Sequence, residues 1–440
     1  MKLFGSVRFT RTSPWLSLTV IVVVTLAASV NRQMVGLIAQ TVKTTLALTD
    51  AQIGGLFSLA GIFVALISPF LGQMVDRFDR HRMLLGSIVI WSLATAAYGL
   101  AAGFFALGLS FAVLAGAETA LVPLCNSIIS DRFRNEARIN ANLVYFAAGG
   151  MTAGIGAYVG GLLLHGAGAS LPYIMRFWPA ALEWRVSLMA TALLGVPLAA
   201  MALLLGKDER RLVNRAMTDL SDLRAYLRDH WQALVSFNLA NAGYYIAATT
   251  IMGWMPIYLA RRFDMTPGDL GMKLGMVIGA ADLLGIFVGL VAVKKLYAAI
   301  GPMAPRYIFQ VALCCIALLC LVQLAAADVW TVLLALGAQN FLATFGTASF
   351  NNMVQDISAP EVRGKIFGFN AFVVSIVSIP GPLLVGMLSD SMTGNPQGLL
   401  ISMMMVSLPA LIASALLCGF TNGSFLRTVR AVRVLEYGAS

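Results

Sequence analysis

Charged residues inside the apolar segments are the first candidates for chemistry, because charge is costly in a membrane. Arg32 lies deep in the first apolar run, which begins near Trp15. An arginine at a helix centre costs at least roughly 2.5–3.5 kcal/mol, so it usually faces a protein interior or a wet cavity. Glu118 is the only acid well inside the other apolar runs of the N-terminal half. We therefore predict that Arg32 and Glu118 pair in a solute cavity. Alternatively, Arg32 extends to one surface, since it lies about 17 residues from Trp15.

Polar side chains also recur at helical spacing in two later apolar runs. One stripe holds Asn238, Asn241, Tyr245 and Thr249, and the other holds Asn340, Thr344, Thr347 and Asn351. Polar stripes in lipid face protein or water, so we expect Asn241, Tyr245, Asn340 and Thr344 to line the cavity. The alternative is that they only hydrogen-bond neighbouring helices. Asp282, in a third run, is either a second proton site or a buried acid bonded to a neighbour.

The composition excludes a soluble protein. Hydrophobic residues make up 59% of the 440 residues and charged residues only 11%, with a mean hydropathy of +0.82. So few charges cannot cover a soluble surface, and a polytopic membrane protein is predicted. The net charge of +10 then reflects cytoplasmic loops, and no nucleic-acid partner is expected. Cysteines and histidines show no metal-binding or catalytic spacing, so we expect no metal, no cofactor and no enzyme activity.

Twelve apolar segments are long enough to span a membrane, and each must be helical because lipid offers no backbone hydrogen bonds. The predicted fold is therefore all-α. The segments lie near 15–42, 51–75, 83–103, 105–130, 139–166, 185–206, 232–260, 269–293, 306–327, 329–354, 363–389 and 397–420.

Loop charges orient these segments. With a cytoplasmic N-terminus, 23 of the 30 lysines and arginines fall on the inside and six on the outside, so both termini are predicted to be cytoplasmic. We expect six-helix bundles at 1–206 and 231–420, joined by an amphipathic cytoplasmic connector at 207–230. The cytoplasmic tail, 421–440, carries Arg427, Arg430 and Arg433, which either contact anionic lipid or lie in a frayed segment.

The two halves repeat one another when the chain is shifted by about 225 residues. The shift aligns Asp131 with Asp356, Glu136 with Glu361, Arg138 with Arg363, Gly156 with Gly381 and Gly161 with Gly386. Two six-helix repeats around a central site are the architecture of transporters.

The loop between predicted helices two and three holds the strongest motif, Gly72-x-x-x-Asp76-Arg77-x-x-Arg80-x-Arg82. A glycine allows close helix approach, and an acid at a helix end can meet a helix N-terminus or an arginine. Together with Asp131, Arg138 and Arg363, these residues are predicted to form a latch that joins the halves in one state and breaks in the other. Otherwise the arginines only mark the cytoplasmic side.

This motif resembles the loop signature of the major facilitator superfamily. Residues 28–165 further resemble its spinster-like branch, which is close to the anion:cation symporter branch. The matching motifs are Asn31-Arg32-Gln33, Leu46-x-Leu48-Thr49-Asp50-x-Gln52-x-Gly54, Trp91-Ser92-x-x-Thr95, Gly116-x-Glu118-x-Ala120-x-x-Pro123 and Trp184-Arg185. The second half agrees at Ala359-Pro360-x-x-Arg363-Gly364 and Gly381-Pro382-x-x-x-Gly386. The resemblance implies twelve helices and alternating access.

The sequence departs from that family at three positions. The family has aspartate in place of Asn31, arginine in place of Phe111 and aspartate in place of Val293. The resemblance links the first-helix acid and the helix-four glutamate to proton coupling. We expect a monomeric, proton-coupled transporter of a small organic, anionic or amphiphilic solute in the cytoplasmic (inner) membrane. A passive facilitator (uniporter) and a non-transporting sensor on the same fold are the alternatives.

Overall fold

The computed structural model describes residues 13–133, 135–203, 205, 226–358 and 362–437. These residues form helices and no strand. The N-terminal half contains α1 (Pro14–Thr45), α2 (Asp50–Arg77), α3 (Arg80–Leu100), α4 (Phe104–Thr119), α5 (Leu121–Arg132), α6 (Asn135–Gly150), α7 (Thr152–Ile174) and α8 (Glu183–Leu203). The C-terminal half contains α10 (Trp231–Phe263), α11 (Pro267–Ile300), the short 3-10 helix η1 (Gly301–Met303), α12 (Ala304–Ala325), α13 (Val329–Asp356), α14 (Arg363–Ser378), α15 (Pro380–Ser391), α16 (Gly398–Phe420) and α17 (Asn422–Tyr437).

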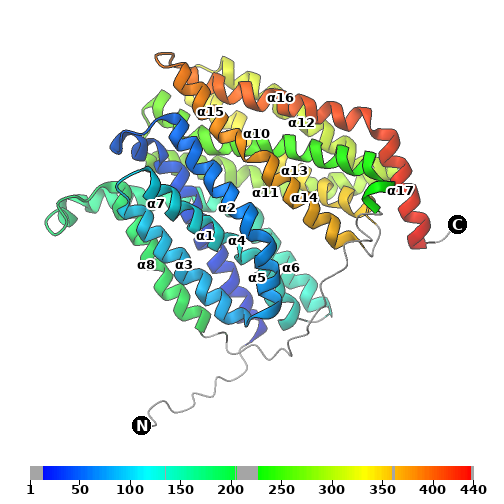
Figure 1. Cartoon of the computed structure of the whole chain (residues 1–440), viewed down its shortest axis with the longest axis horizontal. Helices are drawn as coiled ribbons and strands as arrows, with labels where there is room; N and C mark the ends of the chain where they lie inside the picture. Colours follow the sequence, from blue (N-terminus) through cyan, green and yellow to red (C-terminus); the bar gives the residue numbers. More distant parts are fainter. Residues whose placement is uncertain (1–12, 134, 204, 206–225, 359–361, 438–440) are drawn as a thin grey trace, which may run out of the picture.

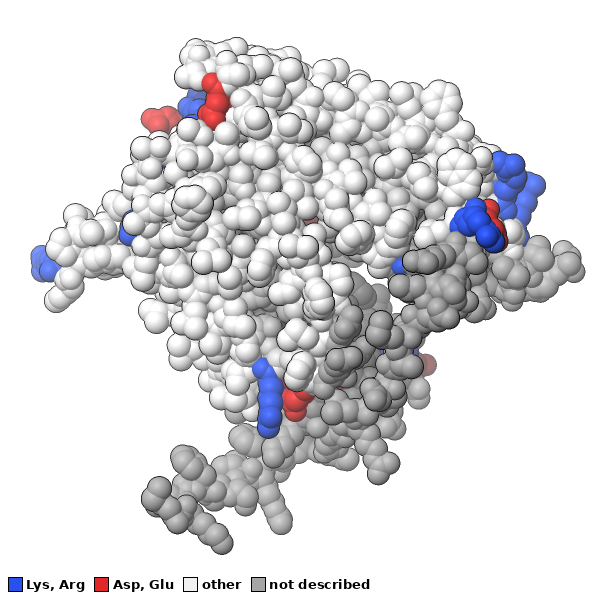
Figure 2. All heavy atoms as spheres, viewed as in Figure 1, with Lys and Arg blue, Asp and Glu red and all other residues white. Residues whose placement is uncertain are grey.

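The protein is a multi-pass membrane protein. Among the described residues, 11 helical segments are long and apolar enough to span a membrane. The twelfth predicted span, 232–260, is the 33-residue α10, which carries the polar stripe with Asn238 and Asn241. Charged side chains on the visible face gather near the helix ends and leave a broad uncharged band between them (Figure 2).

Three of the predicted spans are each divided into two helices. The segment 105–130 is divided at Ala120, 139–166 at Met151 and 363–389 at Ile379. At the last break Pro380 begins α15, and proline cannot donate the backbone hydrogen bond that would continue α14. Sequence hydropathy does not reveal such breaks, because the chain stays apolar across them.

The two halves are in contact at one end and diverge toward the other (Figure 1). The main contacts between the halves pair α7 with α11 and α2 with α15, and α1 also contacts α10. We call the end where α1 ends and α2 begins the closed end. At the opposite end, α5 and α6 diverge from α14 and α17 (Figure 1).

Glycines allow the backbones of the two halves to meet at the closed end. A Cβ on Gly161 of α7 would lie 2.6 Å from the Met272 nitrogen of α11, and one on Gly386 of α15 would lie 2.3 Å from the Asp50 carbonyl oxygen of α2. Gly161 and Gly386 are the positions that the internal repeat aligns. The repeat therefore reflects two equivalent contacts between the halves.

A polar cluster strengthens the closed end. The buried Asp50 carboxylate accepts hydrogen bonds from both terminal nitrogens of Arg261 on α10, at 2.8 and 2.9 Å, and from Ser389 on α15 at 2.7 Å. Lys43 of α1 binds the same carboxylate at 2.5 Å. The Asp390 carboxylate in turn accepts hydrogen bonds from the backbone N–H groups of Asp50 and Ala51 at the start of α2. Charge-assisted bonds of this kind are the stronger hydrogen bonds in proteins.

The described part of the tail is helical. Phe425 and Val429 of α17 are fully buried, and the Arg306 guanidinium binds the Cys418 carbonyl and the Asn422 side chain where α16 meets α17. The tail is therefore not frayed over these residues. Most of the predicted connector, 207–225, lies outside the described residues.

Candidate functional site

The predicted partners Arg32 and Glu118 lie in contact between α1 and α4. The Arg32 Nε donates to Glu118 Oε2 at 2.9 Å. The Arg32 side chain is 63% exposed, whereas the Glu118 side chain is 3% exposed. One face of the guanidinium is thus bound to a buried carboxylate, and the rest is open to another ligand.

The neighbouring residue Asn31 points elsewhere. It is fully buried, and its Nδ2 donates to Thr95 Oγ1 of α3 at 2.8 Å. Thr95 donates its own proton to the Trp91 carbonyl. Successive residues on a helix point about 100° apart, so Asn31 packs inside the N-terminal half while Arg32 is exposed. The family motifs at Asn31 and at Trp91–Thr95 are in direct contact.

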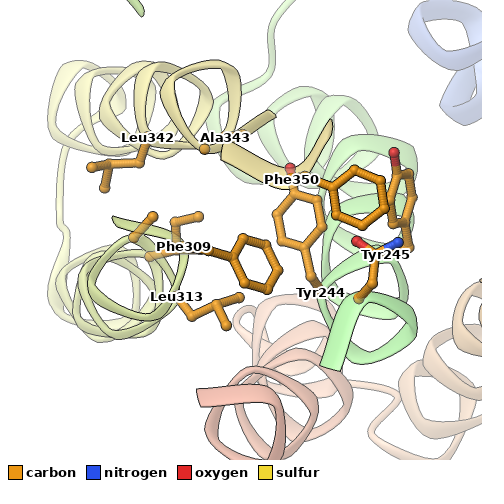
Figure 3. A pocket seen from close by; sticks show the side chains of 11 residues that line it. Tyr244, Tyr245, Phe309, Leu313, Leu342, Ala343 and Phe350 are labelled. Carbon is orange, nitrogen blue, oxygen red and sulfur yellow. The ribbon is translucent and has the colours of Figure 1, made fainter. Parts of the chain in front are cut away.

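An aromatic pocket lies in the C-terminal half, between α10, α12 and α13. It is small and partly open to the outside, and Asn241 and Tyr245 of the α10 polar stripe are among its lining residues. The rings of Tyr244, Phe309 and Phe350 converge in the pocket from these three helices (Figure 3). Polar groups are few among its lining residues, so the pocket suits an apolar part of a ligand.

Asn241 also belongs to a buried chain of amides. Its Nδ2 donates to Asn370 Oδ1 at 3.3 Å, and Asn370 donates to Asn238 at 2.9 Å. Asn241 therefore borders the pocket and at the same time links α10 to α14. Sequence analysis missed Asn370, although a lone amide within the apolar run 363–389 is itself a signal of a buried partner.

The second predicted stripe forms a third cluster around Asp282. Asn340 Nδ2 and Thr344 Oγ1 of α13 both donate to Asp282 Oδ1, at 2.7 and 2.9 Å. Asp282 is 3% exposed. α11 can approach α13 closely here, since a Cβ on Gly285 would lie 2.9 Å from the Phe341 carbonyl oxygen. The sequence named these three polar residues separately, and the structure brings them together.

Two of the latch arginines, Arg80 and Arg363, make contacts within their own halves. Arg80 is buried and pairs with Asp131, and it also donates to the Ser127 carbonyl at 3.0 Å. Arg363 donates to the Ser358 carbonyl at 3.2 Å, whereas Arg82 and Arg138 are exposed. The surroundings of Gly72 and the side chains of Asp76 and Arg77 lie outside the described part. The latch between the halves stays a prediction.

The arrangement suits binding and conformational change. No group of three histidine, cysteine, aspartate or glutamate side chains able to hold a metal occurs among the described residues. What the structure offers is an exposed guanidinium beside a buried acid, an aromatic pocket, and two halves joined at one end. These features define a transporter-type membrane protein.

Comparison with known proteins gives the family. The model of the Major Facilitator Superfamily matches residues 21–382, and the chain belongs to this superfamily. It is a transporter family, and the chain is not an enzyme. An MFS-type efflux pump of Mycolicibacterium smegmatis is 24% identical, over 87% of this chain and 86% of the pump. Protein spinster homolog 1 of Xenopus laevis is 24% identical, over 82% of this chain and 70% of that protein.

A third relative and a solved structure agree with this placement. The 3-(3-hydroxy-phenyl)propionate transporter of Escherichia coli is 24% identical over 89% of this chain and 90% of its own. The inward-facing, unoccupied structure of a bacterial homolog of the human lysosomal transporter spinster superposes with a TM-score of 0.74 at 18% identity, covering 97% of this chain and 98% of that one. The likeness to this structure shows the shared fold.

Proposed function

We propose that the protein is a proton-coupled secondary transporter that moves small organic anions with an apolar body across the cytoplasmic membrane by alternating access. The observation that carries this proposal is the Arg32–Glu118 pair. While Glu118 is ionised, its carboxylate occupies the guanidinium at 2.9 Å. When Glu118 takes up a proton, that contact loses its charge, and the largely exposed Arg32 becomes free to bind the negative group of a solute.

The aromatic pocket supports the proposal that the substrate has an apolar body. Tyr245 and Phe350 are only partly buried, so an apolar body can reach them. Two relatives are named for solutes that combine an anionic group with an apolar body, 3-(3-hydroxy-phenyl)propionate and sphingosine-1-phosphate. This chain is proposed to carry the same class of solute.

The conformation supports alternating access. The halves meet at the closed end through backbone contacts and the Asp50 cluster, and diverge at the other, which is one of the two states such a cycle requires. In the proposed orientation the closed end is outside and both termini are cytoplasmic. Arg427 and Arg430, on the exposed face of α17, then lie at the level of anionic lipid headgroups. A monomer suffices for this mechanism.

A passive facilitator is the second candidate, and one observation favours it. Asn31 stands where the family has an acid, and it is held by Thr95 rather than by Arg32. A single acid beside the arginine provides fewer ways to couple a proton. A non-transporting sensor has no comparable observation in its favour.

Transport by purified protein in proteoliposomes separates these functions. Labelled 3-(3-hydroxyphenyl)propionate and sphingosine-1-phosphate are the first probes, followed by sugar acids and lysolipids ranked by thermal shift. We expect an inward proton gradient to drive accumulation in the wild type. Glu118→Gln should abolish that accumulation but retain exchange, because the neutral amide mimics the protonated acid. Glu183→Gln, at the start of α8, is the matched control and should behave as the wild type.

The outcomes distinguish the alternatives. Uphill transport that is undiminished in Glu118→Gln would refute the assigned role of Glu118. Exchange without any response to a proton gradient would indicate a facilitator. If no probe of the panel moves, the proposed substrate class is wrong.

A further inference from the structure

Asp282 differs from Glu118 in its electrostatic surroundings. Both acids are almost fully buried within membrane-spanning helices. Glu118 is neutralised by Arg32. Among the described side chains, Asp282 receives hydrogen bonds from two neutral donors, Asn340 and Thr344, and both bind its Oδ1 atom. Its Oδ2 atom is buried and has no hydrogen-bond partner among the described residues.

Cations on α11 and the surrounding helices are distant from Asp282 along the axis, bound to other groups, or exposed. On α11 itself, Lys273, Lys294 and Lys295 lie about 13, 18 and 20 Å from Asp282 along the axis. α11 packs mainly on α7 and α13, and also on α1, α6, α10 and α12. The contacts that the basic residues of these helices make elsewhere are Arg32 with Glu118, Lys43 and Arg261 with Asp50, Arg262 with Phe263, and Arg306 with Cys418 and Asn422. Arg138 of α6 is exposed.

Other titratable groups on these helices are tyrosines, cysteines, a histidine and three acids. On α7, Tyr158 packs against Gly275, about two turns from Asp282 along α11, while His165 packs against Gly268 near its start. The closest α7 contact in the turn before Asp282 is Gly154 against Gly279, which brings no ionisable group. The remaining titratable groups are Asp269 and Tyr297 on α11, Glu136 and Tyr145 on α6, Tyr173 on α7, Tyr244, Tyr245 and Tyr258 on α10, Tyr307, Cys314, Cys315 and Cys320 on α12, and Asp356 on α13.

A buried carboxylate without a cation is far more costly than a buried neutral carboxyl, even one whose hydroxyl lacks an acceptor. The two hydrogen bonds to Oδ1 leave Oδ2 as the atom that can carry a proton. We propose that Asp282 is a proton-binding site of the C-terminal half, protonated on Oδ2 at neutral pH and separate from the Arg32–Glu118 pair.

This site would complete the charge balance of the cavity, an inference that rests on the proposed transport function. With Asp282 neutral and Arg32 paired to Glu118, the three groups carry no net charge. Loss of the proton from Asp282 would add a negative charge that opposes an organic anion. Binding of the proton and the anion would thus favour each other, although the family's first-helix acid is replaced by Asn31.

Infrared spectroscopy of the full chain in lipid nanodiscs tests the site directly, with the proton as the only ligand. At neutral pH the wild type should show the carbonyl stretch of a protonated carboxyl, shifted in deuterated water. Asp282→Asn should abolish this band. Asparagine preserves the oxygen that accepts from Asn340 and Thr344, so the fold should tolerate the change. Glu118→Gln and Asp269→Asn, an exposed acid on the same helix, should retain the band.

Each other result overturns the proposal. A wild type without the band would mean that Asp282 is ionised. A band that survives Asp282→Asn, or disappears in Glu118→Gln, would place the proton elsewhere. If Asp282→Asn does not fold, Asp282→Glu is used in its place and should shift the band. A band that Asp282→Glu leaves unchanged would also place the proton elsewhere. Because no solute is needed, the result is independent of whether the transport assay finds a substrate.

Discussion

Replacing Gly154 by alanine should weaken the closed end. A Cβ at this position of α7 would lie 2.3 Å from the Gly279 Cα and 3.1 Å from the Gly275 carbonyl oxygen of α11. Carbon atoms in contact are normally about 3.5–4.0 Å apart, so the two helices must separate by roughly 1.2–1.7 Å. Both clashing atoms belong to the backbone, and no side chain can rotate to relieve them.

The cost falls on one state of the protein. Overpacking of a close contact costs roughly 1–3 kcal/mol. If α7 and α11 separate when the closed end opens, the clash destabilises only the closed state. The ratio of the two states should then shift by roughly 5–150-fold toward opening at this end.

Spin-label distance measurements can detect this shift. Labels at Thr45→Cys and Asn395→Cys, both exposed at the closed end, report on the N- and C-terminal halves respectively. The native cysteines are replaced first. Gly154→Ala should increase the population of long distances. Gly166→Ala is the matched control, because it lies on the same helix and its Cβ would meet no atom within 4 Å.

Two results would contradict this reasoning. If Gly154→Ala gives the wild-type distance distribution, the α7–α11 contact does not stabilise the closed end. If both variants shift the distribution equally, the cause is the higher helix propensity of alanine rather than the contact.

Three further substitutions test other contacts. Arg261→Gln removes the charged hydrogen bonds across the closed end, each worth roughly 1.5–3 kcal/mol, and should also lengthen the label distances. Arg80→Ala should lower the thermal unfolding temperature in detergent far more than the exposed Arg82→Ala, because the buried Arg80 binds both Asp131 and the Ser127 carbonyl; equal effects would refute the importance of these contacts. Asn31→Asp should destabilise the fold by about 1–3 kcal/mol at neutral pH, because an ionised carboxylate cannot donate to Thr95. Protonation restores the donor, so stability should recover as pH falls; a pH-independent loss would contradict this.

The energetic cost of charge and of unpaired backbone in lipid made most of the fold predictable. It gave the helical spans, and it identified Arg32 and Glu118 as partners before any contact was known. The spacing of Gly161 and Gly386 indicated the repeat. Their role in joining the halves required the structure, since a glycine shows which position is small but not what approaches it.

The rest of the site depends on orientation and packing between helices. Asn31 and Arg32 are adjacent in sequence, yet one faces α3 and the other is exposed. Tyr244, Phe309 and Phe350 line the pocket but give no signal in an apolar chain, where a lipid-facing ring and a pocket ring look alike. The contact of Asp282 with Asn340 depends on how closely two helices approach.

The glycine contacts at the closed end also bear on how fast that end can open. Glycine has no rotamers to lose, so backbones that meet through glycines give up little side-chain entropy on closing and regain little on opening. The kinetic barrier should therefore come mainly from breaking the hydrogen bonds of Asp50. One of its donors, Arg261, is partly solvent-exposed. Weakening these hydrogen bonds should then change the opening rate more strongly than loosening the apolar packing.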